Sequence, residues 1–203
     1  MSEFDRWQTR FSAPGYLFGK EPNAFVKSKE ALIRTKAGGK ALSIADGEAR
    51  NGVFIAQCGL DVLSLDFSPT AQEKARKLAA ERGVTIRTEI ADLVTWQWPT
   101  EAFDLIAGIF FQFLTPDLRS KVFANIKKAL KPGGILLLEG YGPKQLEYKT
   151  GGPSQLENLY TPKLLREAFG DLSELDIKEY DAEVDEGAGH IGMSALVDLV
   201  GRK

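Results

Sequence analysis

Short apolar stretches recur along the chain, and the segments between them carry apolar residues at helical spacing. This alternation is typical of a sheet covered by helices. The pattern predicts strands at residues 41–45, 62–66, 85–90, 103–109, 135–140, 175–184 and 195–200. It predicts helices at residues 23–35, 50–57, 70–82, 116–130 and 162–169. Because short crossovers join parallel strands in a right-handed sense, the predicted fold is α/β: a doubly wound, mostly parallel seven-stranded sheet with helices on both faces, Rossmann-like.

Two segments lie outside this alternation, within the single domain that we expect over residues 1–203. Residues 1–22 are interpreted as an N-terminal lid or packing arm, and they carry Trp7, Phe11, Tyr16 and Phe18. Residues 142–161 form a connection longer than most in compact domains. Long loops are often functional, so this one is interpreted as a substrate-side insertion.

Composition narrows the possible partners. The 203 residues include 26 Lys and Arg against 28 Asp and Glu, a formal charge of -2, so no broad cationic field exists for nucleic acid. One cysteine and one histidine exclude an internal disulfide and a Cys/His zinc site, and no metal is expected. The longest apolar run, residues 105–111, is far below the roughly 20 residues of a membrane span. We expect a cytoplasmic protein that acts on a small molecule; its oligomeric state is left open.

The first predicted strand leads into a turn of small and acidic residues, Ala45-Asp46-Gly47-Glu48-Ala49. Its small residues are spaced by two and two, whereas the dinucleotide fingerprint spaces its glycines by two and three. An NAD-type pyrophosphate is therefore disfavoured. The two acidic side chains would repel an anion from the following helix N-terminus and attract a cation.

Carboxylates also follow the next two predicted strands, as Asp66 and Asp92. In other doubly wound nucleoside sites, a carboxylate at the second strand tip accepts hydrogen bonds from ribose hydroxyls. A single such aspartate is more often a helix cap or a turn former. Three successive polar strand tips favour a nucleoside site.

These residues resemble the class I S-adenosylmethionine-dependent methyltransferases over about residues 25–203, and Lys131-Pro132-Gly133-Gly134 is similar to the family's turn before the fifth strand. Segments 16–23, 47–51, 150–153 and 186–190 look like the small bacterial methyltransferases grouped with tellurite-resistance and thiopurine methyltransferases. The resemblance implies S-adenosylmethionine as cofactor, with its methionine end at the turn, its ribose at Asp66 and its adenine at Asp92 and Leu93. The cofactor-binding residues expected on this basis are Ala45, Asp46, Gly47, Glu48, Arg50, Asn51, Asp66, Phe67, Ala91, Asp92, Leu93, Ile109, Phe110 and Gln112.

The turn departs from the family's common pattern at three positions. Ser43 stands where an acidic residue is usual, and Ala45 and Ala49 replace glycines. The added methyl groups narrow the space for a ligand and penalise a positive φ. Our hypothesis is that Asp46 or Glu48 supplies the missing negative charge to the methionine ammonium.

Methyl transfer from a sulfonium requires alignment and exclusion of water rather than a metal. Aromatic faces near the sulfonium add cation–π stabilisation. The candidates are Tyr16, Phe18, Phe110, Phe111 and Tyr141. Of Phe110 and Phe111, which continue a buried strand, one is expected to pack and the other to line the site. Gln112 is expected near the transferred methyl group.

His190, Glu186 and Tyr141 are the candidate catalytic residues. A lone histidine is more often structural than catalytic, although the glycine-rich setting of His190 resembles the family. An oxygen or nitrogen acceptor would pass its proton to His190 or Glu186, whereas a thiolate or chalcogen needs no base. The substrate candidates are Tyr16, Phe18, Tyr148 and Tyr160. The last two flank the long loop and could equally pack onto the sheet.

The predicted activity is methyl transfer from S-adenosylmethionine to a small acceptor, with a thiol, chalcogen or similar soft nucleophile favoured. Two alternatives stay open. One is a cofactor-binding module with lost or regulatory activity, which the altered turn permits. The other is a nicotinamide-linked oxidoreductase, which the spacing of the turn disfavours.

Overall fold

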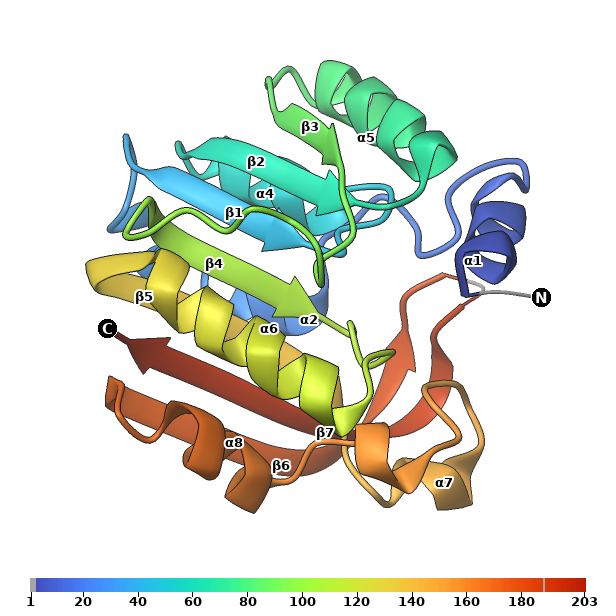
Figure 1. Cartoon of the computed structure of the whole chain (residues 1–203). Coiled ribbons are helices and arrows are strands. Elements are labelled where there is room, and N and C mark those ends of the chain that lie inside the picture. Colours follow the sequence, from blue (N-terminus) through green and yellow to red (C-terminus); the bar gives the residue numbers. More distant parts are fainter. Residues whose placement is uncertain (1–2, 188) are drawn as a thin grey trace. The chain divides into compact units, whose positions relative to one another are not determined.

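The structure is a computed structural model, and it describes residues 3–187 and 189–203. The chain divides into two compact units, one of Met1–Trp96 with Glu186–Gly189 and one of Gln97–Asp185 with His190–Lys203. The strands belong to a seven-stranded sheet of mixed direction (Figure 1). The predicted Rossmann-like α/β fold is thereby confirmed, while a single domain over residues 1–203 stays a prediction.

The first unit contains three parallel strands in the order β3-β2-β1. The strands are β1 (Lys40–Ile44), β2 (Asp61–Asp66) and β3 (Arg87–Ile90), and the helices are α1 (Glu3–Phe11), α2 (Ala24–Ser28), α3 (Glu30–Arg34), α4 (Arg50–Gln57) and α5 (Pro69–Glu81). Helix α5 begins directly after β2, because the Ser68 side chain accepts a hydrogen bond from the Ala71 amide and Pro69 suits the first helical turn. This start fixes the tip of β2.

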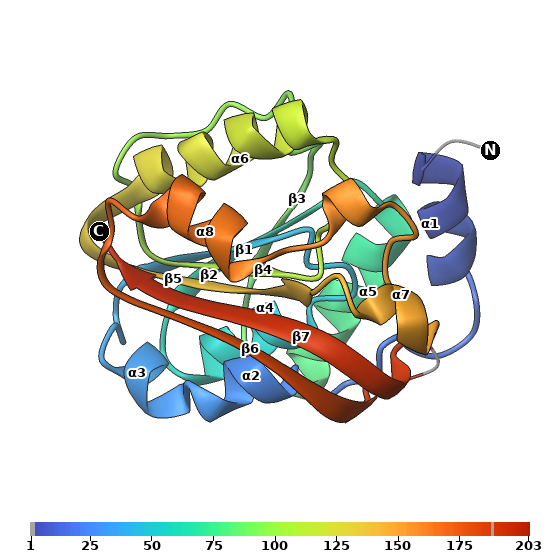
Figure 2. The ribbon, with the colours of Figure 1, turned by 90° about the horizontal axis from the view of Figure 1, so that it is seen from below.

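The second unit holds the remaining strands in the order β4-β5-β7-β6. They are β4 (Phe103–Ile109), β5 (Leu130–Tyr141), β6 (Ser173–Asp185) and β7 (Ile191–Arg202). Strands β4 and β5 are parallel, and β7 runs antiparallel to both β5 and β6. The helices are α6 (Pro116–Ala129), α7 (Gln145–Tyr148) and α8 (Pro162–Phe169). Figure 2 shows α6 and α8 side by side over this part of the sheet.

The N-terminal region differs from the prediction. The single helix predicted over residues 23–35 is wrong, because the chain breaks at Lys29 into two short helices, α2 and α3. Helix α1 lies in the predicted arm, for which the pattern predicts no element. Its helical signal is the spacing of Phe4, Trp7, Gln8 and Phe11 on one face. Residues 1–2 of the predicted arm lie outside the described residues.

The other differences are at boundaries. Strand β5 begins at Leu130 rather than at residue 135, because Leu130 already pairs with Phe103 of β4. The predicted loop 142–161 contains α7 and a short 3-10 helix, Leu156–Asn158. Within residues 3–187 and 189–203, no helix has the length and apolar character needed to cross a bilayer.

Candidate cofactor site

The turn after β1 is built from backbone in the left-handed region. Its φ angles are 47° at Ala45, 55° at Gly47 and 62° at Ala49. Glycine adopts this conformation freely, whereas for an L-residue with a Cβ it is roughly 1–2 kcal/mol less favourable. The penalty expected from the two alanines is thus present, and the turn keeps its shape at a cost in stability.

The Asp46 carboxylate points into the first unit rather than out of the turn. It accepts hydrogen bonds from the Ser64 hydroxyl at 2.7 Å and from the Gly52 amide at 3.4 Å. A Cβ at Gly52 would collide with it, so a glycine is required there. Desolvation raises the pKa of Asp46 to about 6. These partners remove support from a direct contact between Asp46 and a methionine ammonium.

The second acidic residue of the turn, Glu48, also has internal partners. Its buried carboxylate accepts a hydrogen bond from the Leu17 amide at 2.7 Å and pairs with the Lys74 ammonium at 2.8 Å. Lys74 in turn donates to the carbonyl of Ala13. Glu48 therefore ties the arm and α5 to the turn, and the hypothesis of an ammonium contact loses support here as well.

Asp66, at the tip of β2, meets the turn directly. Its Oδ2 accepts a hydrogen bond from the Gly47 amide at 2.9 Å, and its Oδ1 accepts one from the Ser68 amide at 2.9 Å. The side chain is buried, and desolvation raises its pKa to about 6. A carboxylate has about four acceptor positions, and the Phe67 amide also bonds to this one, so one position remains for a ribose hydroxyl. The residues present therefore fit the nucleoside that the family resemblance implies.

The third strand tip is less enclosed. Asp92 is exposed, and its Oδ1 accepts a hydrogen bond from the Val94 amide at 2.8 Å, the contact of a turn former. Leu93 is buried, and the amide of Ala91 donates to the carbonyl of Asp66 at 3.1 Å. Backbone pairing thus joins the second and third tips, and adenine recognition by Asp92 and Leu93 stays a prediction.

Helix α1 and the arm after it cover the turn and the tip of β2. The Phe11 ring lies 3.1 Å from the position that a Cβ on Gly47 would occupy. Gln8 accepts a hydrogen bond from the Ser68 hydroxyl at 2.6 Å. The Phe4 ring lies 5.6 Å from that of Phe67. Sequence reasoning missed Gln8, although it shares the apolar face of α1.

A nearly buried ion pair joins Arg50 to Glu186, with nitrogen and oxygen 2.5 Å apart. Glu186 also accepts hydrogen bonds from the Asn23 side chain at 3.1 Å and the Ala24 amide at 2.9 Å. The Asn23 amide donates to the Asn51 side chain at 2.9 Å. Because its carboxylate is already paired, Glu186 is better suited to holding the arm than to acting as a base.

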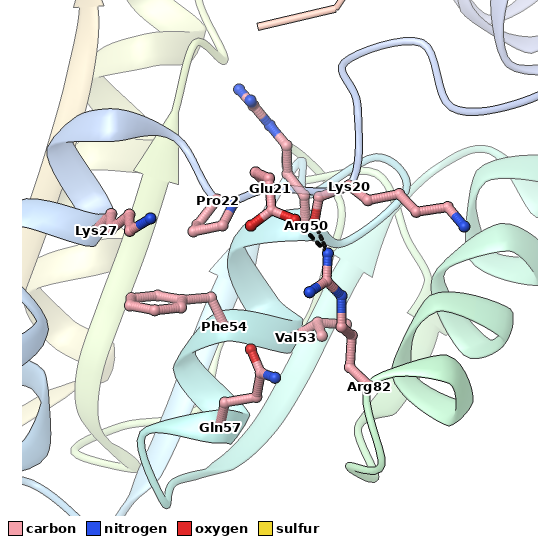
Figure 3. Close-up of a pocket in the computed structure, with 9 residues that line it drawn as sticks. All are labelled: Lys20, Glu21, Pro22, Lys27, Arg50, Val53, Phe54, Gln57 and Arg82. Atoms are coloured by element: carbon pink, nitrogen blue, oxygen red, sulfur yellow. Dashed lines mark hydrogen bonds and ion pairs between the residues drawn. The ribbon is translucent and has the colours of Figure 1, made fainter.

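Arg50 also lines a cavity of about 140 Å³ beside α4. Figure 3 shows the Phe54 and Val53 side chains at this cavity, together with Arg82. Arg82 donates to the Lys20 carbonyl at 3.5 Å and to Glu21 at 2.5 Å. Arg50 is the only predicted cofactor residue in this lining, so we do not place the cofactor there.

In the second unit, one predicted cofactor residue, Phe110, forms a cluster of rings with two predicted catalytic residues, Tyr141 and His190. The Phe110 ring lies 4.6 Å from Tyr141 and 4.5 Å from His190, and Phe110 has a φ of 55°. Phe110 is half-buried, whereas the neighbouring Phe111 is buried. The structure therefore favours Phe110 as the lining residue and Phe111 as the packing residue. Ile109 ends β4 just before them and is also half-buried.

Gln112 is used inside the second unit. Its amide donates to the carbonyls of Tyr141 at 2.9 Å and Asn158 at 3.0 Å, and its oxygen accepts from the Tyr141 amide. A Cβ on Gly140 would collide with the Gln112 side chain, so only glycine fits at that position. These contacts assign Gln112 a bracing role between β5 and the loop, and they remove support from a cofactor contact.

The loop tyrosines have different surroundings. Tyr160 is buried, with its ring 5.9 Å from Phe123 and 6.4 Å from Phe111, and its burial raises the pKa of the phenol. Tyr160 thus follows the packing alternative. Tyr148 is half-exposed beside Lys144. In the first unit, Tyr16 donates to the Lys74 carbonyl at 3.3 Å, so it braces the arm.

Comparisons with known proteins agree with the fold. Residues 41–134 match a family model described as a methyltransferase domain. A 2-heptyl-1-hydroxyquinolin-4(1H)-one methyltransferase of Mycobacteroides abscessus is 28% identical over 130 residues, 61% of this chain and 57% of that protein. A probable thiol methyltransferase 2 of Arabidopsis thaliana is 32% identical over 120 residues, 57% of this chain and 50% of that protein. The chain spans about half the length of the curated relatives that it matches.

Solved structures share the fold. TehB from Haemophilus influenzae has a TM-score of 0.70 at 18% identity, covering 98% of this chain and 66% of TehB. NodS from Bradyrhizobium japonicum, an N-methyltransferase in complex with S-adenosyl-l-homocysteine, has a TM-score of 0.69 at 13% identity, covering 98% and 97%. Residues 41–134 thus match a methyltransferase domain, and the solved structures show the fold. Both findings agree with the predicted class, a class I S-adenosylmethionine-dependent methyltransferase with S-adenosylmethionine as cofactor. The likeness to TehB shows a shared fold, and the predicted grouping with tellurite-resistance methyltransferases stays a prediction.

Proposed function

We propose that the protein transfers the methyl group of S-adenosylmethionine to a small acceptor with a soft nucleophilic atom, such as a thiol or a chalcogen. The observation that carries this proposal is the Asp66 carboxylate, hydrogen-bonded to Gly47 inside the segment that matches the methyltransferase domain. S-adenosylmethionine binding requires a curved backbone for its amino-acid end and a hydrogen-bond acceptor for its ribose. The first unit holds both features side by side, at Gly47 and Asp66.

The residues of the chain supply binding and shielding. When bound, S-adenosylmethionine supplies an already activated methyl group, so the protein needs no strong nucleophile of its own. Asp66 accepts a hydrogen bond from the ribose, and the curved turn presents its backbone around Gly47. Phe11 and the rest of α1 exclude water from the turn, which strengthens electrostatic contacts there.

The acceptor side is assigned to Phe110, Tyr141 and His190 in the second unit. Rings at these spacings offer apolar and polarizable surface, which suits a soft acceptor. His190 would take a proton only from an oxygen or nitrogen acceptor. One relative is named a probable thiol methyltransferase, and this supports the thiol class.

The first test is ligand binding by calorimetry, with S-adenosylhomocysteine and NAD as competing candidates. We expect uptake of S-adenosylhomocysteine and none of NAD. The second test is incubation with methyl-labelled cofactor and matched acceptors: a thiol, a selenol and a phenol of similar size. A labelled thiol or selenol supports the proposal. If only the phenol is labelled, the soft-nucleophile class is wrong and the acceptor atom is an oxygen.

One observation favours a second candidate, a binding module without turnover. Both Ala45 and Ala49 hold positive φ angles where the family commonly has glycine. If the purified protein binds S-adenosylhomocysteine but labels none of the three acceptors or a metabolite extract, this candidate is preferred. The predicted cytoplasmic location and the expected lack of nucleic-acid and membrane partners stay predictions.

A further inference from the structure

Arg10 is a half-buried cation in the last turn of α1. Its guanidinium carbon lies 4.5 Å from the centroid of the Trp7 ring and 5.7 Å from that of Phe18. Among residues 3–187 and 189–203, no carboxylate or carbonyl forms an ion pair or hydrogen bond with it. A guanidinium stays charged in proteins, and a partly desolvated charge is stable when an anion or dipoles compensate for it.

The two rings orient the guanidinium without using its donors. Stacking involves the flat faces of an arginine head, whereas its five N–H groups point outward in the plane. Such a fork matches a carboxylate in a bidentate pair. Burial lowers the pKa of Arg10, and the neighbouring Arg6 lowers it further, so the environment of this side chain already disfavours its charge. An anionic partner would reverse that effect.

Arg10 is linked to the cofactor turn through its neighbours, because the Phe18 ring that it stacks on belongs to a residue whose carbonyl accepts a hydrogen bond from Arg50. The next residue, Phe11, places its ring on Gly47. A Cβ on Gly189 would lie 3.1 Å from an Arg10 nitrogen and would collide with the Phe18 ring. The absence of a side chain at Gly189 therefore leaves room for the stack of Arg10 on Phe18.

The amino-acid end of S-adenosylmethionine carries an ammonium and a carboxylate. Both acidic side chains of the turn, Asp46 and Glu48, have internal partners, and the Arg50 guanidinium at the start of α4 is paired with Glu186. We propose that Arg10 binds the carboxylate of the cofactor's amino-acid end, so that α1 contributes a ligand-binding residue as well as a cover. This proposal rests on the proposed function. An acceptor carboxylate has the same chemistry, and the experiment below separates the two sources because it contains no acceptor.

The test compares two ligands by calorimetry: S-adenosylhomocysteine, and 5′-methylthioadenosine, which has the same nucleoside thioether without the amino-acid end. We expect Arg10→Gln to weaken S-adenosylhomocysteine binding about 10- to 100-fold, because a charge-assisted bidentate pair is lost. Binding of 5′-methylthioadenosine should change less than about twofold, because this ligand has no carboxylate to pair with Arg10 and a solvent-screened charge nearby has little effect. Arg10→Lys should have an intermediate effect, since an ammonium keeps the charge but lacks the fork.

Two further variants keep the result interpretable. Arg76→Gln, which removes an exposed arginine of α5 that donates to the Thr88 hydroxyl, is the matched control and should leave both affinities unchanged. Gly189→Ala leaves Arg10 intact but displaces it, and it should weaken S-adenosylhomocysteine selectively. Equal weakening of both ligands by Arg10→Gln would assign Arg10 to packing of the arm and overturn the proposal, as would unchanged binding of both. A wild-type protein that binds neither ligand contradicts the proposed function instead.

Discussion

The cofactor part in the first unit and the ring part in the second unit are built from opposite chemistry. In the first unit, Asp46, Glu48 and Asp66 each have at least two hydrogen-bond or ion-pair partners, so their positions are fixed by directional contacts. In the second unit, Phe110, Tyr141 and His190 meet through ring faces and edges. Directional contacts preorganise a site for one polar ligand, whereas ring surfaces accept a range of shapes. The first unit therefore specifies its ligand more narrowly than the second does.

The largest expected effect concerns pH and the buried carboxylates. The pKa of Asp46 is raised to about 6 in the folded protein, above its ordinary value of 3.8. The folded state therefore holds this proton more tightly than the unfolded state does. The stabilisation is complete below pH 3.8 and is lost as pH rises through about 6, a decrease of about 3 kcal/mol in unfolding free energy.

Urea unfolding between pH 4 and pH 7.5 measures this effect. Asp66 has the same direction of shift and adds its own loss over the same range. In Asp46→Asn the amide mimics the protonated acid, so the decrease with pH should become roughly half as steep. A variant that keeps the full slope would show that Asp46 is not the titrating group.

The next effect tests the hydrogen-bonded part against the ring part directly. Asp66→Asn should weaken S-adenosylhomocysteine binding about 100-fold at pH 7.5, because the ribose loses a charged acceptor. Tyr141→Phe should change that affinity less than about threefold, because its ring contacts are kept. The amide introduced at position 66 also faces a backbone N–H group, so a urea midpoint for each variant must show that it folds. Comparable losses of affinity in both folded variants would end the distinction between the two parts.

The sequence predicted the strand tips but not the direction of the side chains on them. Asp66 and Gly47 follow strands whose apolar pattern is clear, and the two residues do meet. Asp46 has the same kind of neighbours in sequence, yet it faces inward, because Gly52 leaves space and Ser64 offers a donor on the adjacent strand. Such a choice depends on contacts distant in sequence, which periodicity does not encode.

Helix α1 is a similar case. Its residues show a face of helical spacing, but the segment is short and polar overall, and the helix is held mainly by what it covers. Gln8 pairs with Ser68, and Phe11 sits on Gly47. The roles of Glu186 and Gln112 were also hidden, because a paired side chain and an unpaired one look identical in sequence.

A smaller effect concerns the strained turn. Ala45→Gly should raise the unfolding free energy by about 0.5–1 kcal/mol, because the left-handed penalty exceeds the entropy cost of glycine. Ala49→Gly should gain less, because its buried methyl group contributes about 0.8 kcal/mol that is lost. Ala80→Gly is the matched control: it lies exposed in α5 with ordinary helical geometry and should lose about 1 kcal/mol.

Urea denaturation of the three variants at one pH checks this order. If Ala45→Gly destabilises the protein as much as Ala80→Gly does, the turn is not strained. The affinity of Ala45→Gly for S-adenosylhomocysteine should rise severalfold, since the missing methyl group frees backbone for the ligand. A rise in affinity together with labelled product would also weigh against a module that has lost activity.

The effect of replacing His190 depends on the acceptor, and it is small only for the thiol acceptor that we favour. With a thiol, His190→Gln should change kcat less than about threefold, because a thiolate brings no proton that must be removed in the transfer. With a phenol, the same variant should lose about 100-fold, the usual contribution of a general base, and the loss should shrink as pH rises and the free phenolate supplies the nucleophile. Initial rates from about pH 6 to pH 10 with both acceptors separate the cases, because this range spans the ordinary pKa values of a thiol and a phenol. Equal losses with both acceptors at every pH would mean that His190 only positions the Phe110 and Tyr141 rings, and the ring part would then act as a rigid wall rather than as an adaptable surface.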